Sequence, residues 1–499
     1  MSSLKKRSAR AALWNSAGNA VRLLLQFGVG ILLARMLGPH AFGLVAIALI
    51  LIGFGQLVTD LGFNSAIIQA RELHAADVDF LFTIQFLVGA VLTALVVAIA
   101  EPAAAFFAEP NAGSVIRWMA PVFLMRAMGQ TSAALLSRNL DFHAIQIGTV
   151  GGYVSGYLLV GVSLAFTGHG VWSLVAAYLT QTAVSSALAM AQANRIPRLT
   201  VRGGRRDLFR FGRQVISANL ANWAIINIPA MIVGRIANPT TLGLYSRAVM
   251  LAGAPRDAVV TGLQGVLFAA TSRSQDNPEE IKKALLACVT LYILLAGSIL
   301  LAVAATAVTV VVALFGAEWA EAARLLTPLA VAMMINGAAA FLGPTLMGIG
   351  RVKNEAIVQW QTLLTMQPLV IVAAQISVAA IAWSIAAAQF LRLILLVRAL
   401  HGIIKFDWSK VTAALLPPWF VAVSAAISAT LADQFFSDVS EWWRLPVIVA
   451  SSCLGGCVVL SILRHSLLNG PLAETIIRSN ILPSRMLDYL AKKVRSDIC

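Results

Sequence analysis

Charged residues are scarce in this sequence: they make up 12% of its 499 residues, whereas 59% are hydrophobic. Soluble domains carry about 25% charged residues, so this chain could not cover its surface with polar groups in water. The scarcity excludes a soluble globular protein. Apolar runs of about 20 residues, separated by short polar breaks, repeat along the chain. Because lipid cannot hydrogen-bond an open backbone, these runs must be helices that cross a membrane.

Motifs of metal, redox and nucleotide chemistry are missing as well. The four cysteines form no CxxC pair and have no histidine at metal-ligand spacing. No glycine-rich loop precedes a Lys-Ser or Lys-Thr pair of the P-loop kind. We therefore expect no metal site, no cofactor, no ATP-driven step and no enzyme.

Positive charge is distributed unevenly along the chain. There are 37 Lys and Arg against 22 Asp and Glu, which gives a formal net charge of +15. Most of the cations fall in alternate loops, and the segment 194–213 alone carries seven of them. The intervening loops are mainly acidic. The positive-inside rule explains this bias without nucleic acid, so we expect no nucleic-acid partner and both termini in the cytoplasm.

The apolar runs predict an all-α integral membrane protein with about fourteen transmembrane helices, an even number that agrees with the charge alternation. The expected helices span residues 12–37, 41–70, 77–100, 112–136, 143–167, 170–193, 212–237, 240–270, 284–314, 320–348, 354–376, 377–400, 411–432 and 444–463.

An internal repeat organises these helices. Residues 33–44 read LARMLGPHAFGL and residues 233–244 read VGRIANPTTLGL, with matches at an offset of 200 that continue outside the turn. Six predicted helices separate the copies, so both halves enter the membrane from the same face. Parallel repeats of this kind are related by a pseudo-twofold axis along the membrane normal, with the transport site between them.

The repeat defines the predicted domains. We expect two six-helix bundles, a basic cytoplasmic linker between them, a pair of helices outside the repeat and a cytoplasmic tail. The bundles span 1–193 and 212–405, the linker spans 194–211, the helix pair spans 406–465 and the tail spans 466–499.

Ionisable residues occur at membrane depth. Arg22, Arg126, Arg256 and Arg392 lie well inside predicted spans, and Arg247 lies nearer a span end. Each charge at mid-membrane costs about 2.5–3.5 kcal/mol or more, and such groups usually face a bundle interior or a wet cavity.

Amides accompany these arginines, because Asn19 and Gln26 share one helical stripe with Arg22. Hydrogen bonds between helices that fix packing are the alternative explanation. For the whole set we favour a hydrophilic cavity in which arginines outnumber acids. Guanidinium binds phosphate in a bidentate fork, so this cavity predicts an anionic passenger.

Residues 32–69, LLARMLGPHAFGLVAIALILIGFGQLVTDLGFNSAIIQ, resemble the first helical hairpin of polysaccharide transporters. That family belongs to the multidrug/oligosaccharidyl-lipid/polysaccharide (MOP) exporter superfamily, and the LAR-x-LGP-x-x-FGL turn and the following DLGF are typical of its colanic acid and succinoglycan-type (Wzx-like) exporters. The resemblance implies an inner-membrane flippase for undecaprenyl-pyrophosphate-linked repeat units of an exopolysaccharide. It would work by alternating access, coupled to an ion gradient. Its partners would be the lipid-linked oligosaccharide, membrane lipids and other polysaccharide biosynthesis and export proteins.

Asp60 is the acid whose position best suits ion coupling. Three other functions stay open. A multidrug/cation antiporter should bury acids, and this chain buries mostly arginines. A lipid II flippase shares the expected fold and cavity charge. A membrane glycan polymerase or ligase needs a large outer loop, and every predicted outer loop here is short.

Overall fold

A computed structural model describes residues 2–60, 67, 74–193, 195, 197–200, 206–275 and 277–463. Within these ranges the side chains of residues 2–13, 16, 58, 60 and 206–219 lie outside the description. All regular structure among the described residues is helical. The predicted all-α class is confirmed.

The helices of the first half are α1 (Ser2–Asp60), α3 (Ala75–Ala98), α4 (Ala100–Phe106), α5 (Pro110–Met119), α6 (Val122–Arg138), α7 (Phe142–Tyr153), η1 (Val154–Gly161), α8 (Val162–Phe166), α9 (Val171–Gln192) and α10 (Arg206–Ile236). Those that follow are α11 (Pro239–Arg273), α12 (Pro278–Tyr292), η2 (Ile293–Gly297), α13 (Ser298–Ala305), α14 (Ala307–Phe315), η3 (Ala317–Trp319), α15 (Ala322–Gly348), α16 (Val352–Ala374), α17 (Val378–Ile404), α18 (Trp408–Phe435) and α19 (Glu441–Ile462).

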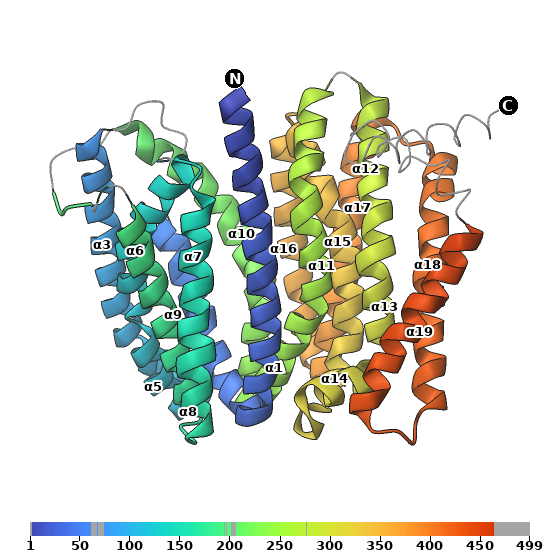
Figure 1. Ribbon diagram of the computed structural model, residues 1–499, viewed down its shortest axis with the longest axis horizontal. Coiled ribbons are helices and arrows are strands. Elements are labelled where there is room, and N and C mark those ends of the chain that lie inside the picture. Colours follow the sequence, from blue (N-terminus) through green and yellow to red (C-terminus); the bar gives the residue numbers. More distant parts are fainter. Residues whose placement is uncertain are drawn as a thin grey trace. The chain divides into compact units, whose positions relative to one another are not determined.

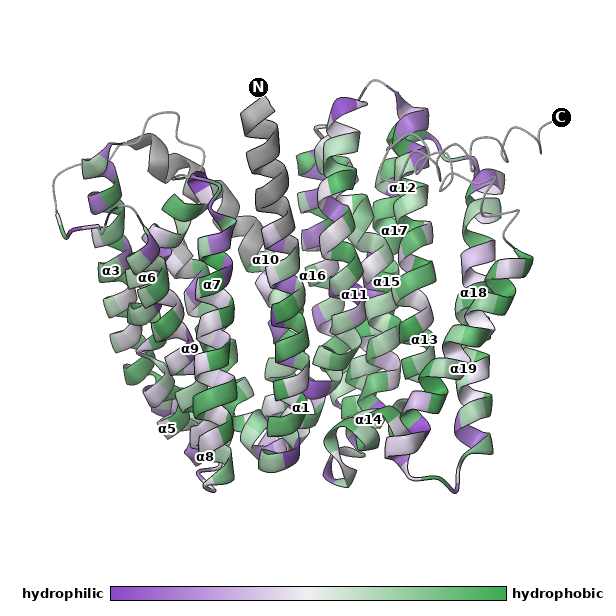
Figure 2. Cartoon of the chain, viewed as in Figure 1, coloured by the Kyte–Doolittle hydropathy of each residue, from purple (hydrophilic) through white to green (hydrophobic). Residues whose placement is uncertain are grey.

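Ten helical stretches among the described residues are long and apolar enough to cross a membrane. Apolar residues cover most of the length of helices such as α13 and α19, and hydrophilic residues gather mainly near helix ends (Figure 2). Large apolar side chains on these helices are exposed, for example Leu364 at 69% and Leu454 at 67%. Such surfaces require lipid around them. The chain is therefore a multi-pass membrane protein.

A sharp turn divides α1 into two helices at the predicted place. Gly38 adopts φ 67° and ψ 174°, a conformation open to glycine and strained for other residues. Pro39 then starts the second helix, where its missing N–H costs nothing. Pro239 begins α11 in the same way, after Asn238, whose side chain accepts a hydrogen bond of 2.8 Å from the backbone N–H of Thr241.

These two turns pack against each other. A Cβ atom on Gly43 would collide with the backbone carbonyl of Pro239. A Cβ atom on Gly243 would collide with the backbone carbonyl of Pro39. The contact is reciprocal. Glycine at both positions is what lets the two backbones approach.

The chain folds into two compact units, Met1–Ser246 and Arg247–Cys499. In the first unit, α3, α6, α7 and α9 run alongside one another, and in the second α15, α16 and α17 do so (Figure 1). The core of the second unit contains Tyr292, Phe341 and Leu346, all fully buried. The Tyr292 hydroxyl donates a 2.9 Å hydrogen bond to the carbonyl of Met333. The domain ranges derived from the repeat stay a prediction.

Candidate functional site

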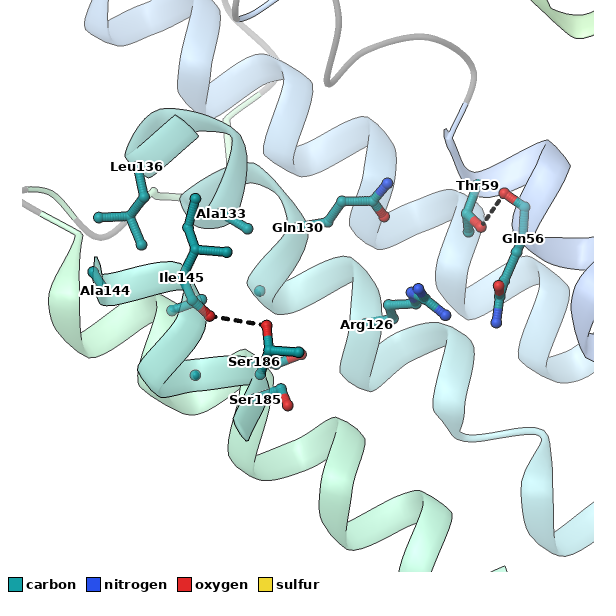
Figure 3. Close-up of a pocket in the computed structure, with 14 residues that line it drawn as sticks. Gln56, Thr59, Arg126, Gln130, Ala133, Leu136, Ala144, Ile145, Ser185 and Ser186 are labelled. Atoms are coloured by element: carbon teal, nitrogen blue, oxygen red, sulfur yellow. Dashed lines mark hydrogen bonds between the residues drawn. The ribbon is translucent and has the colours of Figure 1, made fainter. Parts of the chain in front are cut away.

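A polar pocket of about 370 Å³ lies within the first unit, between α1, α6, α7 and α9. Gln56 and Thr59 come from α1, and Ser185 and Ser186 come from α9. Arg126 of α6 is the charged residue among those that line it. Figure 3 shows its guanidinium directed toward the side chain of Gln56. The pocket thus offers one cation surrounded by amide and hydroxyl groups.

Close packing of α6 on its neighbours directs Arg126 into this pocket. The buried Ala127 lies against Gly89 of α3, where an added Cβ would stand 2.9 Å from that of Ala127. Gly129 lies against Ser186 of α9, with no room for a side chain. Since these two faces of α6 are occupied, the exposed side chain of Arg126 occupies a third.

The predicted stripe on the first helix meets α7. The Gln146 side chain lies over Gly18 and donates a 3.0 Å hydrogen bond to the Oδ1 atom of Asn15. Asn19 donates to the same oxygen at 3.5 Å. Arg22 is half-buried, and its Nε has no hydrogen-bond partner among the described residues. Part of the stripe therefore serves helix packing, which is the alternative explanation, and the role of Arg22 stays a prediction.

The remaining predicted arginines belong to the second unit. Arg256 of α11 forms an ion pair with the adjacent Asp257, and its side chain is 26% exposed. Arg247 approaches the sulfur of Met250 at 3.3 Å. Arg392 of α17 lies 3.6 Å from a carboxylate oxygen of Glu355, and both side chains are only 15% exposed. Arg256 and Arg392 therefore each have an acidic partner.

Sequence reasoning missed Glu355 because it stands at the start of a predicted helix, where acids are common. The structure places it on α16 facing Gly343 of α15, where an added Cβ would be 2.9 Å from Oε1. One signal could have identified it: an arginine deep in a span, such as Arg392, usually has a partner of opposite charge. A further polar contact joins α15 to α17, since Asn336 of α15 donates at 2.9 Å to Gln389 of α17.

The predicted site residues thus separate into two groups. Asn19, Arg22, Gln26 and Arg126 lie in the first unit, and the polar pocket includes Arg126 among them. Arg247, Arg256 and Arg392 lie in the second. The side chain of Asp60 lies outside the described residues.

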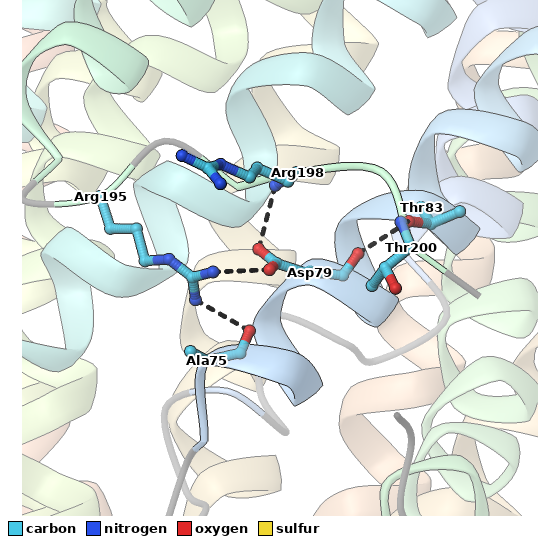
Figure 4. A network of polar contacts seen from close by, with 6 residues as sticks. All are labelled: Ala75, Asp79, Thr83, Arg195, Arg198 and Thr200. Atoms are coloured by element: carbon cyan, nitrogen blue, oxygen red, sulfur yellow. Dashed lines mark hydrogen bonds and ion pairs between the residues drawn. The ribbon is translucent and has the colours of Figure 1, made fainter. Parts of the chain in front are cut away.

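The beginning of the basic linker is fastened to the first unit (Figure 4). Asp79 of α3, whose side chain is 12% exposed, pairs with the guanidinium of Arg195 at 2.5 Å. The same carboxylate accepts a 2.9 Å hydrogen bond from the backbone N–H of Arg198. Arg195 also donates to the carbonyl of Ala75, and the backbone N–H of Thr200 donates to Thr83. These bonds give the linker a structural role beyond the predicted topological one.

We expect Asp79→Asn to loosen this attachment. The amide keeps the size of the carboxylate but loses its charge, and hydrogen bonds to charged groups contribute about 1.5–3 kcal/mol. Thermal unfolding in detergent should show a clearly lower midpoint, and a protease should cut the linker faster. Glu101→Gln is the matched control, because its ion pair with Arg117 is exposed and should contribute about 1 kcal/mol or less. Equal behaviour of the two variants would contradict the role of Asp79.

Comparison with known proteins identifies the family. A family model described as "Polysaccharide biosynthesis protein" matches residues 32–324, more than half of the chain. The succinoglycan biosynthesis transport protein ExoT of Rhizobium meliloti is 25% identical over 72% of this chain and 72% of its own length. The teichuronic acid biosynthesis protein TuaB of Bacillus subtilis is 23% identical over 91% of this chain and 95% of its own. The lipopolysaccharide biosynthesis protein WzxC of Escherichia coli is 22% identical over 70% and 72%.

Solved structures show the same fold. The lipid II flippase MurJ in an inward closed conformation superimposes with a TM-score of 0.71, covering 91% of this chain and 100% of that one, at 12% identity. An inward-facing multidrug resistance MATE transporter of the MOP superfamily gives a TM-score of 0.55 over 79% and 94%, at 17% identity. The chain belongs to the polysaccharide biosynthesis protein family.

Proposed function

We propose that this protein carries a lipid-linked oligosaccharide, the undecaprenyl-pyrophosphate-linked repeat unit of a surface polysaccharide, across the inner membrane. Transfer runs from the cytoplasmic to the periplasmic leaflet by alternating access of two helix bundles. The relatives support the substrate class, since ExoT is named for transport in succinoglycan biosynthesis and WzxC for lipopolysaccharide biosynthesis. The fold shared with MurJ supports the mechanism.

The observation that carries this proposal is Arg126 in its polar pocket. A guanidinium in a membrane helix is costly unless water or an anion solvates it. The pocket supplies amide and hydroxyl groups around this cation, a suitable set for phosphate oxygens and sugar hydroxyls. At about 370 Å³ the pocket is of a size for part of such a substrate rather than the whole. We also propose Asn19, Arg22 and Gln26 of the first unit, and Arg247, Arg256 and Arg392 of the second, as substrate-binding residues.

The architecture that we propose has fourteen transmembrane helices, arranged as two six-helix bundles in a parallel pseudo-twofold repeat and two further helices. The reciprocal packing of Gly43 and Gly243 against the opposite prolines supports the repeat, because a chance resemblance would produce no such symmetry. The charge bias of the loops supports cytoplasmic termini.

We propose Asp60 as the ion-coupling residue because of its position in the sequence. Asp60→Asn should therefore insert normally and export little, and the loss should persist at every proton and sodium gradient applied. Measuring the flux of lipid-linked sugar from the outer (cytoplasmic) leaflet to the inner (periplasmic) leaflet of inverted vesicles, with each gradient imposed in turn, tests this. Export by the variant at the wild-type rate would exclude the role.

The rival functions make different demands on the site. A drug/cation antiporter should present a carboxylate to its passenger, whereas the polar pocket presents Arg126. A lipid II flippase would suit a similar cationic site, so the relatives named for surface polysaccharides favour our proposal over it. A glycan polymerase or ligase is the least favoured, since the relatives and structural neighbours include transporters.

Deletion of the gene tests the proposal directly. We expect one surface polysaccharide to disappear and its undecaprenyl-pyrophosphate-linked repeat unit to accumulate in the cytoplasmic leaflet. Peptidoglycan synthesis and drug sensitivity should not change. Accumulation of lipid II would assign the protein to the peptidoglycan pathway. Repeat units that reach the periplasmic side but are not joined to one another would indicate a polymerase.

A further inference from the structure

A groove of about 520 Å³ lies in the second unit, at the end of α17 and the beginning of α18. Leu393, Ile394 and Val397 form its apolar part. Arg398, His401, Gly402 and Trp408 line the rest. Residues 393 to 402 rise about 13 Å along the helix, so the apolar and basic parts lie at different depths. Neither the pocket around Arg126 nor the Glu355–Arg392 pair includes any of these residues.

Aromatic stacking and a hydrogen bond fix the His401 ring at the basic end of the groove. The His401 ring stacks on Trp408 with centroids 5.5 Å apart and on Phe406 at 6.2 Å. The backbone N–H of Phe406 donates a 3.0 Å hydrogen bond to Nδ1 of His401. In the neutral ring this bond leaves the proton on Nε2, so His401 has a donor to offer. Lys405, with φ 44°, makes the tight turn that brings Trp408 back to the ring.

Charge and position identify the occupant. Arg398, Lys405 and Lys410 give this end of the helices an excess of cations over Asp407, and it is one of the ends that the loop charges predict to be cytoplasmic. Trp408 is 52% exposed, as is typical of a tryptophan at the lipid headgroup level. Basic pockets between transmembrane helices on that side of the membrane suit anionic lipid headgroups.

We propose that this groove binds one anionic glycerophospholipid of the surrounding leaflet. An acyl chain lies along Leu393, Ile394 and Val397, and the headgroup phosphate accepts hydrogen bonds from Arg398 and His401. The missing side chain of Gly402 leaves open space for the headgroup next to His401. This lipid site is separate from the proposed transport site. Lipid binding to it can be measured without any transport assay.

Two variants of the full-length protein test the site, with phosphatidylglycerol as the probe. Gly402→Leu fills the groove, and it should fold because a Cβ atom at Gly402 meets nothing within 4 Å. Gly262→Leu is its matched control, since that glycine also has no neighbour within 4 Å and lies outside the groove. Arg398→Gln removes the phosphate contact, and Lys410→Gln removes a charge at the same end from a side chain that is 79% exposed.

Native mass spectrometry of protein purified in detergent measures the lipid that each variant retains. The wild type, Gly262→Leu and Lys410→Gln should retain one phosphatidylglycerol, and phosphatidylcholine or inorganic phosphate should not displace it. Gly402→Leu and Arg398→Gln should bind it about tenfold or more weakly, the loss expected for a charge-assisted hydrogen bond. Unchanged retention by both variants would overturn the proposal. Preferential retention of undecaprenyl phosphate by the wild type would also overturn it and assign the groove to the transported lipid. Either result leaves the transport proposal standing.

Discussion

Replacing Arg126 with alanine is expected to reduce polysaccharide export at least about tenfold while the protein still inserts and folds. The variant loses the charged group of the polar pocket, and a hydrogen bond to a charged partner contributes about 1.5–3 kcal/mol, which corresponds to about ten- to hundredfold in affinity. Export is measured as surface polysaccharide in the deletion strain, together with the lipid-linked repeat unit that remains inside.

Further variants separate charge from geometry and provide a control. Arg126→Lys keeps the charge but not the planar fork, so we expect partial export if phosphate is the ligand. Arg324→Ala is the control, because this arginine is 76% exposed and should be dispensable. Arg22→Ala should resemble Arg126→Ala. Full export by both alanine variants would contradict the cationic site.

Gly43→Ala is expected to destabilise the protein more than Gly28→Ala or Gly53→Ala in the same element, α1. The new Cβ would meet the backbone carbonyl of Pro239, and backbone cannot turn away as a side chain can. Overpacking of this kind costs about 1–3 kcal/mol, occasionally more. The midpoint of thermal unfolding in detergent should fall, and export with it, because the turn pair can no longer close.

Gly28→Ala is the matched control for this prediction. A Cβ atom at Gly28 meets nothing within 4 Å, so alanine should stabilise the helix by about 0.5–1 kcal/mol. Gly243→Ala should behave like Gly43→Ala, because its Cβ would meet the carbonyl of Pro39. The double variant should lose less stability than the two single losses combined, since either substitution alone already separates the turns. Strict additivity would show that the turns do not act as a pair.

How far the sequence predicts the site depends on the range of each interaction. The break in the first helix was predictable, because Gly38 and Pro39 act locally on the backbone. That Arg126 would line a cavity was also predictable, since a charge at membrane depth needs polar surroundings. Its neighbours were not: Gln56 and Ser185 lie far from it in the chain. No periodicity within one helix reports which face of another helix it meets.

Glu355 shows the same limit, because no local pattern in the sequence indicated the residue's role. Its position near the start of α16 made it look like an ordinary helix-end acid, and only the packing of α16 on α17 places it beside Arg392. The stripe of Asn15, Asn19 and Arg22 was visible as a pattern in the sequence. The pattern did not show which of these side chains form hydrogen bonds to another helix. Gln146, on a helix far away in the chain, donates a hydrogen bond to Asn15 and so uses this part of the stripe for packing.

By itself the sequence determined that this protein is a helical membrane protein with an excess of positive charge in alternate loops, because apolar runs of about 20 residues satisfy their backbone hydrogen bonds in a bilayer by forming helices. It also marked the arginines at membrane depth. Only the tertiary structure decided which polar groups surround Arg126, that Glu355 faces Arg392, and that the turns at Gly43 and Gly243 interlock. These features depend on contacts between segments distant in the chain, and such contacts arise from helix packing rather than from any local pattern.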